Sequence, residues 1–143
     1  MRKRYIFVFL LLVLTALTFA GCRRNPEKAK HKYLDSGMKF MDEKQYEAAS
    51  IQFKKAIQVD PKFAEAHYQL GQAAVKLEHW GEGFREMSQA VELDPNNLKA
   101  RVAVGDFYLA GGKFAEAEEQ AKAIIERDPN NACLLYTSPS PRD

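Results

Sequence analysis

Apolar and polar residues recur at helical spacing through most of the chain. Ala49, Phe53 and Ala56 follow one another at intervals of four and three residues, which places them on one face of a helix. This apolar face ends before Asp60-Pro61, where a proline pushes the residue before it out of the helical region. The pattern therefore predicts short amphipathic helices that are separated by polar breaks.

The same pattern returns every 34 residues, and Asp60-Pro61 recurs as Asp94-Pro95 and Asp128-Pro129. Four more columns keep this interval, each with one kind of side chain: glycine, aromatic, small and β-branched. Their members are Gly37, Gly71 and Gly105; Tyr46, Trp80 and Phe114; Ala49, Gly83 and Ala117; and Ile57, Val91 and Ile125. Five columns in one register indicate a repeat of two helices per unit, and about three such units are needed for a stable stacked core.

These columns and their period resemble the tetratricopeptide repeat (TPR) family. In the first unit, the eight columns of the family pattern hold Tyr33, Ser36, Gly37, Phe40, Ala49, Phe53, Ala56 and Pro61. The resemblance covers units 30–63, 64–97 and 98–131. It implies an all-α solenoid of three antiparallel helix pairs, preceded by an N-terminal signal helix. Arg101 and Ala121 match the pattern least, so we expect looser packing in the third unit.

In TPR proteins, the first helices of successive pairs line a concave groove that accepts a peptide or helix from a partner. The resemblance therefore implies a partner-binding groove at the columns that usually face it. These columns hold His31, Leu34, Met38, Met41, Glu65, Tyr68, Gln72, Val75, Lys99, Val102, Asp106 and Leu109. Met38, Met41, Leu34 and Tyr68 are expected to form an adaptable apolar floor. A core position is an equal expectation for Leu34, Val75 and Val102.

One class of TPR site is excluded by the residues in these columns. Chaperone-binding members hold a C-terminal carboxylate with a set of basic and amide side chains. Leu34 and Met38 occupy two of those columns here, and Ala103 occupies a third. Because Lys99 alone cannot form that clamp, we expect a different kind of partner segment.

Residues 1–21 have the pattern of a bacterial signal peptide. Three basic residues precede an apolar run over residues 6–20, which is shorter than the about 20 residues of a spanning helix. Phe19-Ala20-Gly21-Cys22 is similar to the lipobox of bacterial lipoproteins, which implies a covalent lipid on Cys22 and cleavage just before it. Several acyl chains make a durable anchor. An ordinary cleaved signal peptide and an uncleaved membrane anchor are the alternatives.

A lipid on Cys22 implies a location in the bacterial cell envelope, with the repeats facing the periplasm. Arg23, rather than an aspartate, follows the cysteine, and by analogy with enteric bacteria this favours the outer membrane over the inner one. Residues 22–29 are predicted to be a short linker from the lipidated cysteine. Its basic residues could touch anionic head groups, although a solvated spacer is the simpler interpretation.

Residues 132–143 abandon the repeat and are predicted to be an unstructured tail. Cys133–Asp143 is similar to a translated sequencing adapter over its whole length, which indicates that this segment is not natural protein. A genuine disordered tail rich in Ser-Pro is the alternative. Because natural solenoids end in a capping helix, we expect the intact gene to continue with more repeats or with such a helix.

The charge balance argues against nucleic acid as a partner. The chain has 21 basic and 19 acidic residues, and without Arg2, Lys3 and Arg4 the basic count becomes 18. A nucleic-acid-binding domain requires a basic face. The three units carry formal charges of +2, −4 and −1 in order, so the middle unit could favour a basic partner segment. A solvated acidic face accounts for the same charges.

The sequence contains no candidate catalytic or metal-binding constellation. His31, His67 and His79 lie in different predicted elements, without Cys or carboxylate partners at metal-ligand spacing. The glycines at 81, 83, 111 and 112 fall in turns between helices rather than in a phosphate-binding loop. We therefore expect no enzyme active site, no metal and no cofactor other than the lipid on Cys22.

Together these features predict a lipid-anchored scaffold or adaptor that binds peptide or helix segments of other proteins. TPR modules of this kind occur in pilus assembly, outer-membrane protein insertion and exopolysaccharide or exosortase-linked systems. One alternative is the docking region of a larger enzyme whose catalytic domain lies beyond the end of the sequence. Self-association through an uncapped apolar end of the array is another.

Overall fold

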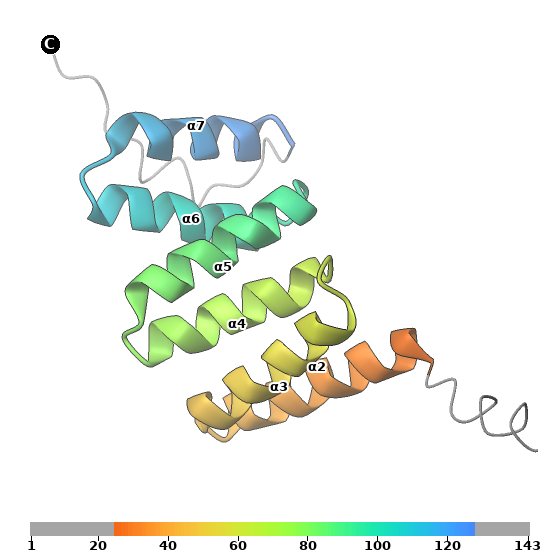
Figure 1. The fold of residues 1–143 in the computed structure, drawn as a ribbon. Coiled ribbons are helices and arrows are strands. Elements are labelled where there is room, and N and C mark those ends of the chain that lie inside the picture. The colour runs from red at the N-terminus through yellow and green to blue at the C-terminus, as the bar shows by residue number, and fades with distance from the viewer. Residues whose placement is uncertain (1–24, 128–143) are drawn as a thin grey trace, which may run out of the picture.

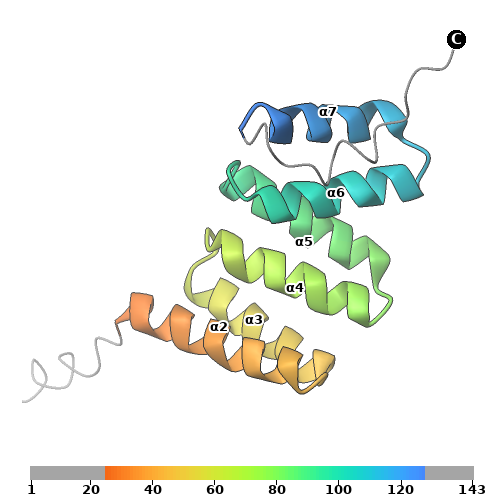
Figure 2. The same ribbon diagram turned by 180° about the vertical axis from the view of Figure 1, so that it is seen from behind.

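The helices follow one another in a single stack. The computed structural model describes residues 25–127, which form six α-helices and no strand. They are α2 (Pro26–Asp42), α3 (Tyr46–Val59), α4 (Ala64–Lys76), α5 (Trp80–Leu93), α6 (Leu98–Ala110) and α7 (Phe114–Ile125). Each helix packs against the next in sequence, and α2 also contacts α4. Figure 1 shows the three pairs, and Figure 2 shows them from behind, with α2, α4 and α6 toward the viewer. The predicted all-α solenoid is confirmed.

Several predictions concern residues outside this range. The signal peptide over residues 1–21, the lipidated Cys22, the third Asp-Pro at Asp128-Pro129 and the tail over residues 132–143 all lie outside the described residues. Within residues 25–127, none of the helices is long and apolar enough to cross a membrane.

The first helix begins earlier than predicted. Asn25 caps α2, because its side chain accepts a hydrogen bond from the backbone nitrogen of Glu27 at 3.1 Å. Pro26 stands at the start of the helix, where its missing N–H costs no hydrogen bond, and Glu27 lies at the positive end of the helix dipole. The predicted linker over residues 22–29 is therefore wrong for residues 26–29, which form the first turn of α2.

The turn inside each pair is a Schellman motif that repeats with the 34-residue period. Lys44, Glu78 and Gly112 adopt left-handed φ angles of 59°, 62° and 71°. In the first turn, the nitrogen of Lys44 donates to the oxygen of Met41, and the nitrogen of Gln45 donates to the oxygen of Phe40 at 2.8 Å. Only the third turn has a glycine at the left-handed position, so the first two carry the strain of a side chain there.

The Asp-Pro stop signals behave as predicted in the first two units. Asp60 and Asp94 are extended at the ends of α3 and α5, with φ angles of −140° and −133°. The carboxylate of Asp60 accepts from the nitrogen of Lys62, and that of Asp94 accepts from the nitrogen of Asn96, each at 3.0 Å. These side-chain bonds satisfy backbone donors in the turn that leads to the next pair.

The glycine column sets how closely the helices of a pair approach. The ring of Phe53 lies where a side chain on Gly37 would project, and a Cβ on Gly71 would lie 2.6 Å from Cγ of Met87. At Gly105 the nearest atom would be Cβ of Gln120, at 3.7 Å. The filling side chain thus shrinks from Phe53 to Met87 to Ala121 along the array. As expected from Ala121, the third pair is packed most loosely.

A polar column explains why Arg101 departs from the family pattern. Nε of Arg101 donates to the oxygen of Pro95 at 2.9 Å, and its NH1 donates to Gln120 at 3.1 Å. His67, 34 residues earlier, makes the equivalent contacts. Its Nε2 lies 3.1 Å from the oxygen of Pro61, and its Nδ1 lies 2.8 Å from the carboxylate of Glu86. Both residues therefore join the two helices of a pair to the preceding Asp-Pro turn.

The glycine column predicts a contrast between two identical substitutions. Gly71→Ala places a methyl group against Met87 and 3.1 Å from the backbone oxygen of Gly83, so it should lower the free energy of unfolding by about 1–3 kcal/mol. Gly105→Ala meets only ordinary contact, and it should be neutral or stabilising by up to about 1 kcal/mol because alanine favours a helix. Urea unfolding followed by circular dichroism measures both. Equal effects at the two positions would contradict this account of the packing.

Candidate partner-binding groove

The twelve predicted groove residues lie on α2, α4 and α6, which form one layer of the array (Figure 2). None of them is fully buried. His31, Met38, Lys99 and Asp106 are exposed, and the other eight are half-buried. The layer therefore presents side chains that a partner can reach, although the side chains at its two ends differ in how far they serve the core.

At the α2 end, most of the predicted apolar floor serves the core. Leu34 and Met41 pack against a buried cluster made of Ala49, Phe53, Leu70 and Ala73. Met38, by contrast, is 38% exposed. Of the three apolar α2 residues expected in the floor, Met38 is thus the one that lies most open to a partner, whereas Leu34 and Met41 help to hold α2 and α3 against α4.

On α4, the groove residues are ordered by hydrogen bonds along the helix. Nε2 of Gln72 donates to the phenol oxygen of Tyr68 at 3.0 Å, and Nε2 of Gln69 donates to the carboxylate of Glu65 at 2.7 Å. Burial raises the pKa of Tyr68 further above the physiological range, in which a phenol is neutral. Tyr68 therefore offers a fixed aromatic surface whose hydroxyl is already oriented.

Between α4, α5 and α6 the surface opens into a cavity of about 320 Å³, which we call the α4–α6 notch. Three predicted groove residues line it, together with side chains that sequence reasoning assigned elsewhere. Its lining consists of Gln72, Val75, Trp80, Met87, Ala103, Asp106, Phe107 and Ala110.

The predicted turn position is wrong for Gly81 and Gly83, which lie in the first turn of α5. Gly83 lets the floor of the notch form. A Cβ on Gly83 would lie 2.9 Å from Cγ2 of Val75 and 3.3 Å from Cζ of Phe107. Val75 and Phe107 therefore both pack over this glycine, one from α4 and one from α6. Phe107 is held further by an edge-to-face contact with Phe84, with ring centroids 5.6 Å apart.

Asp106 is the one ionisable residue in the lining of the notch. Partial burial raises the pKa of its carboxyl group above the ordinary value. None of the ion pairs within residues 25–127 involves Asp106. The notch thus combines apolar walls with a carboxylate that has lost part of its hydration.

Sequence reasoning missed Trp80, Met87, Ala103, Phe107 and Ala110 as lining residues. Trp80 and Met87 belong to α5, and the resemblance assigns groove positions only to the first helix of each pair. Trp80 is 57% exposed, which is unusual for the single tryptophan of a chain. The aromatic column predicts that Trp80 recurs at the 34-residue interval, but it does not predict that its side chain lines the notch.

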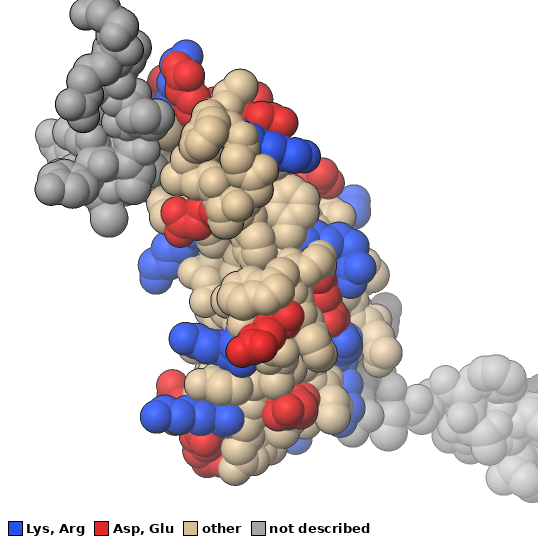
Figure 3. Space-filling model, turned by 90° about the vertical axis from the view of Figure 1, so that its left-hand side faces the viewer, with Lys and Arg blue, Asp and Glu red and all other residues tan. Residues whose placement is uncertain are grey.

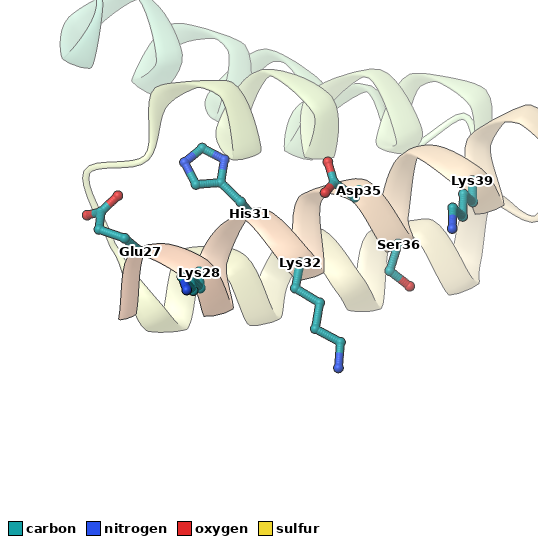
Figure 4. Close-up of a pocket in the computed structure, with 7 residues that line it drawn as sticks. All are labelled: Glu27, Lys28, His31, Lys32, Asp35, Ser36 and Lys39. Carbon is teal, nitrogen blue, oxygen red and sulfur yellow. The ribbon is translucent and has the colours of Figure 1, made fainter. Parts of the chain in front are cut away.

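A second hollow, which lies on α2, is not a site of this kind. It measures about 740 Å³ and is lined by Glu27, Lys28, His31, Lys32, Asp35, Ser36 and Lys39, all on α2. All seven lining residues come from one helix, and Figure 4 shows their side chains projecting from it in different directions. Since a binding pocket needs walls from more than one direction, this surface encloses nothing.

Charge on the edge that carries the turns within the pairs is mixed. Figure 3 shows acidic and basic side chains interspersed around uncharged surface, without a large area of one sign on that face. Within the part of the chain that the structure describes, no three His, Cys, Asp or Glu side chains are placed to hold a metal ion. His67 is used in packing, and the ring of His31 makes an edge-to-face contact with Phe63.

Two sequence-family models match the chain. One, described as TPR repeat, matches residues 37–77, and the other, described as tetratricopeptide repeat, matches residues 68–132. Together they span the region in which the 34-residue columns occur. A search of curated proteins finds no match to this chain.

Solved structures with the same fold are numerous. The second TPR domain of human RPAP3, in complex with the HSP70 peptide SGPTIEEVD, has a TM-score of 0.71 and 24% identity, over 80% of this chain and 95% of that one. The first TPR of Spaghetti (RPAP3), bound to the HSP90 peptide SRMEEVD, has a TM-score of 0.71 and 21% identity, over 78% and 88%. The Arabidopsis OM64 TPR domain has a TM-score of 0.70 and 18% identity, over 78% and 93%.

The raised pKa of Asp106 predicts how its removal alters stability with pH. The pKa of Asp106 is higher in the folded state than in the unfolded state. At neutral pH, the charged carboxylate therefore destabilises the folded state, because folding removes part of its hydration. Asp106→Asn should therefore be more stable than the wild type at pH 7. The difference should shrink as the pH falls toward about 4, because the carboxyl group becomes increasingly protonated in both states.

Urea unfolding at pH 7 and pH 4 measures this difference, with Glu92→Gln as control. Glu92 is exposed on α5, so its removal changes the net charge equally without relieving burial. An equal stability difference at both pH values, or an NMR titration that places Asp106 in the ordinary range, would contradict the prediction.

Proposed function

Because the chain belongs to the tetratricopeptide repeat family, we propose that it is a membrane-tethered scaffold or adaptor that binds segments of other proteins. The segment lies along the layer formed by α2, α4 and α6. The observation that carries this proposal is the set of reachable side chains on that layer, which includes Met38, Tyr68 and, at the α4–α6 notch, Asp106. Grooves that combine apolar floors with a few polar groups accept amphipathic segments.

The structural neighbours support binding of a peptide but not the same peptide. Two of them hold the chaperone peptides SGPTIEEVD and SRMEEVD, which end in acidic residues. In this chain, Leu34 and Met38 stand in two of the columns that the clamp requires, and Ala103 stands in a third. An apolar groove with an acidic middle unit suits a segment that carries apolar and basic residues instead.

The leader supports the location of the scaffold. A lipid on Cys22 would hold the first repeat beside a membrane of the bacterial envelope, facing the periplasm, with the outer membrane favoured over the inner one. There the repeats would gather components of an envelope, pilus or exopolysaccharide or exosortase-linked assembly. Because α2 begins at Pro26, only residues 22–25 separate the lipid from the folded array. The groove would therefore stay close to the membrane surface.

Tyr68→Ala should weaken partner capture without unfolding the array. Tyr68 is half-buried on α4, and its removal deletes an aromatic contact that typically contributes about 1–2 kcal/mol, or roughly tenfold in affinity. Crosslinking in the source cell identifies the partner, and titration of that partner against wild type and variant measures the loss.

Tyr46→Ala is the matched control, since Tyr46 is also a half-buried tyrosine but lies at the start of α3, outside the groove layer. Unchanged affinity of Tyr68→Ala for the partner, or an equal loss of affinity with Tyr46→Ala, would show that the partner binds outside this groove.

Cys22→Ser should abolish acyl labelling and release the protein from membranes, because the thiol that accepts the lipid is gone. Labelling with a radioactive fatty acid and fractionation of the cells measure the two effects. Cys133→Ser is the control, since Cys133 is the other cysteine of the chain. This variant should be labelled as strongly as the wild type. Membrane retention by Cys22→Ser, without any label in the wild type, would indicate an uncleaved anchor.

A further inference from the structure

The α4–α6 notch has the shape and lining of a site for one large apolar side chain. Its volume of about 320 Å³ lies at the lower end of the roughly 300–1,000 Å³ range of ligand pockets. Met87 at 2% exposure and Trp80 at 57% both line it, so the notch runs from the core to the open surface. Tryptophan at the edge of a pocket is the residue most enriched among those that dominate binding energy.

Asp106 adds a charge preference to this apolar site. Its carboxylate lines the notch, and no described Lys, Arg or His forms an ion pair with it. Desolvation raises the pKa of this carboxyl group. A partner that covers the notch removes more water from this carboxylate, and this costs free energy unless the partner supplies a cation.

The net charge of the middle unit also favours a basic partner segment. The unit over residues 64–97, which contributes α4 and α5, carries a formal charge of −4. An acidic neighbourhood attracts basic segments and disfavours acidic ones. The apolar lining of the notch selects an apolar side chain, and Asp106 selects a basic residue beside it.

We propose that the α4–α6 notch binds an apolar side chain of a partner protein whose lysine or arginine, next to that side chain in the segment, pairs with Asp106. The proposal rests on the proposed function, because it names the chemistry of the segment that the groove accepts. The apolar side chain lies between Val75, Phe107 and Trp80, and the cation lies at the side of the notch that Asp106 forms.

A random twelve-residue peptide library displayed on phage tests the specificity. The bait is the full chain reconstituted in phosphatidylcholine vesicles, whose neutral surface does not collect basic peptides, and empty vesicles give the background. We expect enrichment of peptides with an aromatic or long aliphatic residue near a lysine or arginine. With Asp106→Lys as bait, the enriched peptides should carry acidic residues instead, because the charge at the notch is reversed.

The fluorescence of Trp80 tests the place of binding. Trp80 is the only tryptophan of the chain. Binding of an enriched peptide that lacks tryptophan should therefore shift the emission of Trp80 to shorter wavelength. Asp106→Asn should weaken this peptide about fivefold, whereas Glu92→Gln, which changes the net charge equally, should not. Ala103→Phe should fill the notch and abolish the shift, with its folding checked by circular dichroism.

Each other result overturns the proposal. Absence of enrichment above empty vesicles, equal enrichment on wild-type and Asp106→Lys baits, or unchanged Trp80 emission would each exclude it. A shift of Trp80 emission that depends on the concentration of the chain alone would identify a second copy as the occupant. If the partner captured in the cell depends on Tyr68 but not on Asp106, the proposed function stands and only this inference fails.

Discussion

Close approach of the two helices in each pair is the constraint on which the rest of the structure depends. Gly37 and Gly71 have no side chain, so Phe53 and Met87 from the opposite helix fill the space above them. Both of these side chains are almost fully buried and belong to the core of the stack. This close approach sets how the two helices of a pair lie against each other, and so it helps to keep α2, α4 and α6 in one layer.

The same kind of contact creates the candidate site. Gly83 lets Val75 and Phe107 meet over α5, which leaves the α4–α6 notch open above them. In the third pair, Ala121 fills less space than Phe53 or Met87, and a small cavity of about 20 Å³ remains between α6 and α7. Packing quality thus falls along the array toward its C-terminal end. The polar contacts of Arg101 with Pro95 and Gln120 join these helices where apolar contact is thinner.

A scaffold of this kind works through its surface rather than through chemistry at one atom. The buried histidine, His67, is engaged by Glu86 and the oxygen of Pro61, so it contributes to packing. The reachable groups are instead Met38, Tyr68 and Asp106 on the layer of α2, α4 and α6, together with Trp80 of α5 at the edge of the notch. Such a layer suits recognition of a segment through several modest contacts, and the lipid tether that we propose would raise the local concentration of that segment at the membrane.

The repeat, the helix pairs and their stop signals could be predicted from the sequence. A 34-residue period and an Asp-Pro dipeptide act locally, through helical spacing and the restriction that proline places on the residue before it. The Asn25-Pro26-Glu27 start of α2 was also local, and it shows that the predicted linker overlooked a capping signal already present in the sequence. The predicted groove columns lie on the first helix of each pair because they follow from the same period.

Which of the predicted groove residues remain accessible to a partner depends on the packing of the helices. Leu34 and Met41 are drawn into the core because Phe53, Leu70 and their neighbours lie beneath them, whereas Met38 is not. Trp80 and Met87 border the notch although they belong to the second helix of their pair, since Gly83 brings three helices together at that point. These outcomes depend on contacts between residues far apart in the sequence, and a periodic pattern carries no information about how such side chains share the space between helices.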